Sequence, residues 1–208
     1  MQIQEHAVLY ALLCKEVIKA AGKKEGEKLI KEFTQSYGHK RGRRMRANSS
    51  AGDLNDYFIN GEWKGKQGEN LSKLSFEDDK TESIVFKCAW YDTWKKYGLT
   101  EYGSYYCRYI DKAIVKGFDE DLVLNVEKAF GYGDDRCVFV WMEKADEEKV
   151  SCTEKKHILP FDFHCKEMFE TALQVFSEHD LRQTAFDALK EWELCFPEYA
   201  GAVDLSNC

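Results

Sequence analysis

Apolar residues recur at helical spacing in long segments near both ends of the chain, and this periodicity constrains the fold most strongly. Residues 4–21 carry apolar side chains three or four positions apart, and Gly22 ends the pattern. A second segment of the same kind begins at Glu25. Residues 161–196 repeat the helical spacing, with a break near residues 179–180. The two ends of the chain are therefore predicted to be helical.

The middle of the chain mixes strand and helix patterns. Short apolar runs bounded by turn residues predict strands at residues 71–76, 83–88, 122–130 and 136–144. Helices are predicted at residues 90–97 and 100–116, each closed by a glycine, and a helical turn at residues 53–58 within a Gly-, Asn- and Asp-rich stretch. The fold class is thus α+β: N-terminal helices, a small antiparallel sheet with helices packed on it, and a long C-terminal helical segment.

The length of 208 residues suits one well-buried core. We predict a single domain over residues 1–208, with an N-terminal helical part (1–60), a mixed core (70–145) and a C-terminal helical segment (160–197). The longest apolar stretch, residues 7–14, is far shorter than the roughly 20 residues that span a bilayer. We therefore expect a cytoplasmic protein without membrane association.

Eight cysteines are scattered along the chain with no C-x-x-C pair, which favours reduced thiols over a disulfide scaffold. The formal net charge of -7 makes general nucleic-acid binding unfavourable, because polyphosphate partners prefer a basic surface. Both features fit a protein that handles a small molecule.

A local basic run at residues 40–46 is the exception to the acidic composition. If the second helix continues through it, Arg41 and Arg44 lie on the same face as core-like residues. Guanidinium groups can clamp a carboxylate or phosphate through two parallel hydrogen bonds, so this pair, with His39 beside it, is a candidate anion site. The alternatives are a solvated helix face and a patch for nucleic acid or anionic lipid.

Cys107 and Asp111 form the second candidate site. On a helix they are one turn apart and share a face with apolar residues, so a carboxyl group points toward the core. A buried carboxylate is costly and tends to mark a functional site or a salt bridge. It can orient a substrate nitrogen or transfer a proton, and the neighbouring thiol is either a nucleophile or a packing residue.

Cys88 stands just before a predicted helix, where a helix N-terminus can lower a thiol pKa. Together with Cys107 and Cys137 it offers thiolate ligands for a divalent metal such as zinc, although their long spacing does not itself define a metal site. No H-E-x-x-H, G-x-S-x-G, P-loop or dinucleotide-binding motif is present in the sequence.

Several short segments, in this order, resemble the L-2-amino-thiazoline-4-carboxylic acid hydrolase family. They extend over about residues 5–142 and comprise residues 37–42, Cys88 followed by Trp94, Tyr106-Cys107 with Asp111, residues 116–118, and residues 133–139. Two positions depart from the pattern that we associate with the family. Ala89 replaces a proline after the first cysteine, and Ile110 replaces the first of two adjacent aspartates after the second cysteine. The hairpin at residues 133–139 also resembles the 4-vinyl reductase type of small-molecule-binding domain.

The resemblance implies a hydrolase that opens a five-membered thiazoline ring at its C–S bond and yields an N-carbamoyl cysteine. The predicted catalytic residues are Cys107, Asp111 and Cys88, and the predicted substrate-binding residues are His39, Arg41, Arg44, Tyr106 and Asp134. The expected partner is a small anionic substrate. The alternative function is a binding or sensor domain without chemistry.

Aromatic residues cluster in the middle of the chain, among them Trp90, Trp94, Tyr105 and Trp141. Such rings can fill the core, line a pocket or contact a second copy of the chain in a homo-oligomer. The sequence leaves these three roles open.

Overall fold

The described chain divides into two compact units, one helical and one built around a sheet. Two long helices, α2 (Lys23–Ala47) and α5 (Thr100–Phe118), each contribute residues to both units. The computed structural model describes residues 1–155 and 157–203. The helical unit comprises Met1–Tyr37, Ala89–Tyr106 and the described part of Pro160–Cys208, and the sheet unit comprises Gly38–Cys88 and Cys107–Leu159. The prediction of a single domain stays a prediction.

Helix α1 (Ile3–Ala21) forms the core of the helical unit. Its side chains are buried on nearly every face, as expected for a central helix. Helices α4 (Ala89–Tyr97), α7 (Phe161–Glu178) and α8 (Arg182–Cys195) pack against it or against one another. The indole N–H groups of Trp94 and Trp192 donate to backbone carbonyls of α1 at 2.8 and 2.9 Å, which fixes two of these helices onto it.

The helical predictions are confirmed, with shifts at their ends. The basic run at residues 40–46 lies inside α2, which continues to Ala47. The predicted break near residues 179–180 separates α7 from α8, and Asp180 adopts a left-handed φ of 60° there. Gly117, expected to close α5, instead lies within that helix, because its missing side chain is needed for packing, as shown below.

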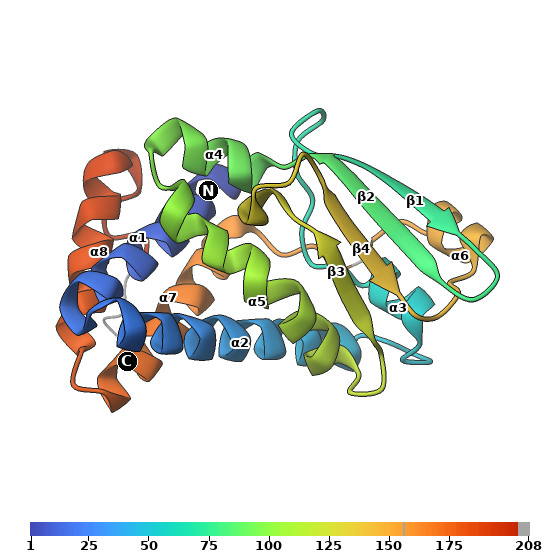
Figure 1. Ribbon diagram of the computed structural model, residues 1–208, viewed down its shortest axis with the longest axis horizontal. Coiled ribbons are helices and arrows are strands. Elements are labelled where there is room, and N and C mark those ends of the chain that lie inside the picture. The colour runs from blue at the N-terminus through green and yellow to red at the C-terminus, as the bar shows by residue number, and fades with distance from the viewer. Residues whose placement is uncertain (156, 204–208) are drawn as a thin grey trace. The chain divides into compact units, whose positions relative to one another are not determined.

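The sheet unit contains an antiparallel sheet of four strands in the order β1-β2-β4-β3 (Figure 1). The strands are β1 (Leu71–Phe76), β2 (Thr81–Lys87), β3 (Leu124–Lys128) and β4 (Cys137–Trp141). A 3-10 turn, η1 (Phe130–Tyr132), lies in the connection between β3 and β4. The predicted α+β class and the antiparallel sheet are confirmed.

One face of the sheet carries Cys137, Phe139 and Trp141 of β4, which alternate with Val138 and Val140 on the other. Helix α3 (Leu54–Ile59) packs on the first face, where the rings of Phe58 and Trp141 are 4.8 Å apart. Cys137 therefore points to the side of the sheet that is covered by helix. Helix α6 (Glu147–Cys152) and the 3-10 turn η2 (Pro197–Tyr199) were not predicted.

Glycines bring the second halves of α2 and α5 into backbone contact within the sheet unit. A Cβ atom on Gly38 would lie 2.6 Å from that of Ala113, and one on Gly117 would lie 2.5 Å from the carbonyl oxygen of His39. A Cβ on Gly42 would overlap the backbone of α5 at Ile114. The glycine in the basic run thus serves helix packing.

Across the described residues, none of the helices combines the length and apolar character that crossing a membrane requires.

We predict that Gly42→Ala destabilises the protein by about 1–3 kcal/mol, because the added methyl group forces the two backbones apart. This steric cost exceeds the gain of about 1 kcal/mol in helix propensity. Denaturant unfolding would measure it, with Arg43→Ala, an exposed neighbour on the same helix, as the control. Equal stability of the two variants would contradict the close packing.

Candidate active site

Asp111 is the central carboxyl group of the candidate site. It lies on α5, one turn after Cys107, and its side chain keeps partial exposure to solvent. Burial raises the pKa of Asp111 to about 6, although the positive charge of Arg41 and a backbone hydrogen bond act in the opposite direction. A carboxyl group in this state can take up and release a proton near neutral pH.

Side chains from several elements of the sheet unit lie within electrostatic range of Asp111. Burial raises the pKa of Tyr57, on α3, and the negative charge of Asp111 raises it further. Burial raises the pKa of Tyr132, which lies in η1, and the negative charges of Cys107 and Asp111 raise it further. Neither tyrosine was predicted as a site residue, because neither belongs to a recognisable motif.

Cys107 and Cys137 face the turn between β3 and β4. The backbone N–H of Gly131 is directed at the Cys107 thiol, and that of Phe130 at the Cys137 thiol. Burial outweighs these hydrogen bonds. It raises the pKa of Cys107 well above its usual value and the pKa of Cys137 to about 12. The charge of Cys88 raises both pKa values further. The two groups are therefore thiols at neutral pH, and either would need a base before acting as a nucleophile.

The predicted thiols do converge, since Cys88, Cys107 and Cys137 influence one another electrostatically. Convergence alone does not make a metal site. Within residues 1–155 and 157–203, no three or more His, Cys, Asp or Glu side chains are arranged to hold a metal ion. Metal binding by these cysteines stays a prediction.

Arg41 and Arg44 contact a carboxylate of the protein itself, Glu62. Arg44 donates from Nη2 to Glu62 Oε2 at 3.0 Å and from Nε to the other carboxylate oxygen. Arg41 Nε donates to Glu62 Oε2 at 3.3 Å. Because the Glu62 side chain is only 1% exposed, this is a buried ion-pair cluster. Binding of a substrate carboxylate by the two arginines stays a prediction.

Glu62 gave no signal in the sequence. It lies in a loop without apolar periodicity, and its contacts to α2 span about twenty residues. The backbone carbonyl of Glu62 accepts a hydrogen bond from the N–H of Leu159 at 2.8 Å. This bond holds the loop against a second segment of the sheet unit.

His39 and Asp134 lie in the sheet unit, and substrate binding by either residue stays a prediction. Burial lowers the pKa of His39, and the charges of Arg43 and Lys116 lower it further, so its imidazole is neutral at neutral pH. The carboxylate of Asp134 accepts the backbone N–H of Ala129 at 2.9 Å and thereby closes the turn after β3.

Tyr106 belongs to the helical unit, unlike the other predicted site residues. Its ring is nearly buried and contacts Tyr10, His6 and Trp94 at centroid distances of 4.8, 5.8 and 6.2 Å. Its contacts within that unit are those of a core residue.

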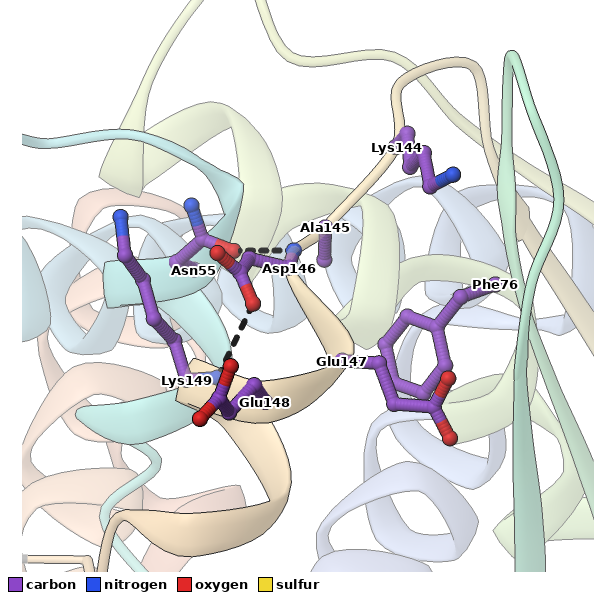
Figure 2. A pocket seen from close by; sticks show the side chains of 8 residues that line it. All are labelled: Asn55, Phe76, Lys144, Ala145, Asp146, Glu147, Glu148 and Lys149. Atoms are coloured by element: carbon purple, nitrogen blue, oxygen red, sulfur yellow. Dashed lines mark hydrogen bonds between the residues drawn. The ribbon is translucent and has the colours of Figure 1, made fainter.

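A surface hollow in the sheet unit lies beside α6 and is lined by Asn55, Phe76 and residues 144–149 (Figure 2). Its polar groups already take part in local structure. Asp146 accepts the backbone N–H of Lys149 at 3.1 Å, and its own N–H donates to Asn55 at 2.6 Å. These bonds cap α6, and the hollow contains none of the predicted site residues.

A protein-family model matches the chain. The family model described as L-2-amino-thiazoline-4-carboxylic acid hydrolase matches residues 1–141. No curated protein and no solved structure matches the chain. The matched region includes Arg41, Glu62 and Asp111.

We predict that at about pH 7.5 iodoacetamide modifies Cys107 and Cys137 at least about tenfold more slowly than Cys152, because burial keeps the first two protonated. Cys152 is the control, since it is exposed in α6. Peptide mass spectrometry over a time course would measure the rates. Faster labelling of Cys107 would show that it is an activated thiolate.

We further predict that Asp111→Asn stabilises the fold above about pH 6 by about 1–2 kcal/mol. The folded-state pKa of about 6 exceeds the unfolded value of about 3.9, so ionisation costs folding energy as the pH rises from about 4 to 6. Asparagine avoids this cost. Denaturant unfolding at about pH 4 and 7.5 would measure the gain in unfolding free energy of the variant over the wild type. A larger gain at the lower pH would contradict the prediction.

Proposed function

We propose, since the chain belongs to the L-2-amino-thiazoline-4-carboxylic acid hydrolase family, that it is a hydrolase acting on a small anionic cyclic amidine of the thiazoline carboxylate type. The observation that carries the proposal is a partly exposed carboxyl group, Asp111, whose pKa burial raises to about 6 and on which the charge of the buried Arg41 acts. Proton exchange and anion attraction are both needed to open such a ring.

The reaction consumes one water molecule. Its oxygen bonds to the ring carbon between nitrogen and sulfur, and the carbon–sulfur bond of the resulting tetrahedral intermediate then breaks. The carbon becomes the carbonyl of an N-carbamoyl group, and the sulfur leaves with its electron pair and takes up a proton to become a thiol. Both protons of the water must therefore leave its oxygen: one is matched by protonation of the ring nitrogen of the neutral amidine, and the other, lost as the carbonyl forms, is delivered to the sulfur.

In this proposal Asp111 accepts the proton of the attacking water and can return it to the departing sulfur. Its ionised form also attracts the amidine nitrogen of the substrate. Water is favoured over Cys107 as the nucleophile, because burial holds the Cys107 thiol in its protonated form. Two alternatives stay within the same proposal: Cys88 as the nucleophile, and a divalent metal that assists the reaction. Activity with and without a chelator tests the role of the metal.

Recognition of the substrate carboxylate is assigned to the basic end of α2. Arg41 contacts Glu62 through Nε, and Arg44 contacts it through Nε and Nη2. A carboxylate bound alongside Glu62 would share these two cations. His39 and Asp134 remain candidate substrate-binding residues in this proposal.

We expect the purified, reduced protein to convert L-2-amino-thiazoline-4-carboxylate to N-carbamoyl cysteine, followed by mass spectrometry with and without a chelator. Asp111→Asn should lower kcat/KM by about 10²–10⁴-fold, because it removes the proton acceptor. For the wild type, kcat/KM should rise with pH up to about pH 6, where Asp111 becomes ionised.

Asp121→Asn is the matched control, since Asp121 is exposed and follows α5 in the same unit. Absence of product with and without chelator would overturn the proposed substrate. A ligand that raises the melting temperature and yet remains intact on long incubation would instead favour a binding or sensor domain. Cys88→Ala tests the thiol alternative. If Cys88→Ala is inactive while Asp111→Asn keeps full activity, Cys88 and not Asp111 is the catalytic residue.

A further inference from the structure

The face of the sheet that points away from α3 carries a row of apolar side chains. Val138 and Val140 of β4 lie on this face, and the register places Ile84 of β2 beside Val138. Phe86 follows Ile84 by two positions, so its side chain points to the same side. The N–H of Met142 donates to the carbonyl of Val123 at 3.2 Å, which continues the pairing of β3 and β4 by one step. We call this surface the outer face; its apolar residues are Ile84, Phe86, Val123, Val138, Val140 and Met142.

Large apolar side chains at the two ends of this row are in contact with water. The exposed fraction is 54% for Phe86 at one end, and 56% for Met142 and 54% for Val123 at the other. Val138 and Val140 lie between these ends and are buried. Connected apolar surface of this kind on a folded protein is typical of an interaction site.

Two opposite charges lie beside the apolar row. Lys73 of β1 is paired with Ile84, and Glu82 of β2 is paired with Val140, so both side chains point to the outer face. Among the described residues, neither Lys73 nor Glu82 forms an ion pair within the chain. The outer face therefore offers one positive and one negative group to a binding partner.

We propose that the outer face binds the outer face of a second copy of the chain, in a symmetric dimer with two stacked sheets. A two-fold axis beside Ile84 places Lys73 of each copy opposite Glu82 of the other. Stacked sheets lie about 10 Å apart, a distance that a lysine and a glutamate side chain reach across together. The same axis places Phe86 of one copy over Val140 of the other. This inference does not depend on the proposed function.

A second copy fits this surface better than a lipid bilayer does. The headgroup region of a membrane is neutral or negatively charged, so it offers no favourable partner to the carboxylate of Glu82. A two-fold contact instead places each charge against its opposite and covers the apolar row with the same row. Charge complementarity of the outer face with itself thus selects a second copy as the occupant.

The size of the outer face sets the expected strength of the dimer. Four strands about 4.8 Å apart, each about six residues long, make a face of about 15 by 20 Å. This area is at the lower end of specific protein interfaces. We therefore expect a reversible dimer with a Kd of about 1–50 μM, whose population rises with protein concentration.

Sedimentation velocity of the full chain between about 1 and 200 μM tests the dimer. Phe86→Lys should raise the Kd at least about tenfold, because it places a charge in the apolar contact. Leu194→Lys is the matched control, since Leu194 is an apolar residue of α8 that is 84% exposed and should leave the Kd unchanged. A monomer at every concentration, or a dimer that Phe86→Lys does not weaken, would overturn the inference.

A charge exchange tests the two-fold contact itself, and decides the question even if Phe86→Lys fails to fold. Lys73→Glu and Glu82→Lys should each raise the Kd about three- to tenfold, because each variant on its own brings like charges together. A mixture of the two variants should form a mixed dimer with a Kd close to that of the wild type, since both contacts are then between opposite charges.

Lys149→Glu, with the same charge change at an exposed position of α6, is the control and should dimerise like the wild type. Association of mixed Lys73→Glu and Glu82→Lys chains would be followed by sedimentation with a fluorescent label on one variant. A mixture that associates no better than either variant alone would exclude the Lys73–Glu82 contact and overturn the proposed dimer.

Discussion

The close approach of α2 and α5 in the sheet unit is the contact on which the candidate site depends. Gly38, Gly42 and Gly117 lack the side chains that would separate the two backbones. Arg41 is the immediate neighbour of Gly42, and Asp111 lies two positions before Ala113, which Gly38 faces. The charge of Arg41 on the first helix acts on Asp111 of the second, so the two closely packed helices also carry an electrostatic interaction of the candidate site.

The buried charges of the sheet unit cost the fold stability, which fits the catalytic role proposed for them. Removing a carboxylate or a guanidinium group from water costs several kcal/mol, and a buried ion pair often does no better than apolar residues of the same size. The unit nevertheless buries Glu62 and Arg41 and keeps Asp111 largely out of water. Such a concentration of costly groups is typical of sites where proton affinity is adjusted for a reaction.

Periodicity in the sequence was sufficient to predict the long helices, the antiparallel strands and the placement of Cys107 and Asp111 on one helix face. It also indicated that Arg41 and Arg44 lie on the same side of α2. It did not identify Glu62 or Tyr57, because a contact between a helix and a loop some twenty residues away has no periodic signature. It likewise placed Gly117 at a helix end, since the use of glycine for interhelical contact depends on a partner helix distant in the chain.

The helical unit is assembled from three separate stretches of chain, and this has a consequence for synthesis on the ribosome. Helix α1 is translated well before α7 and α8, which cover much of its apolar surface. Nascent α1 must therefore wait until α7 and α8 have been made before it is enclosed. Chains interrupted before Pro160 would expose that surface, which makes premature termination a direct route to aggregation or chaperone capture.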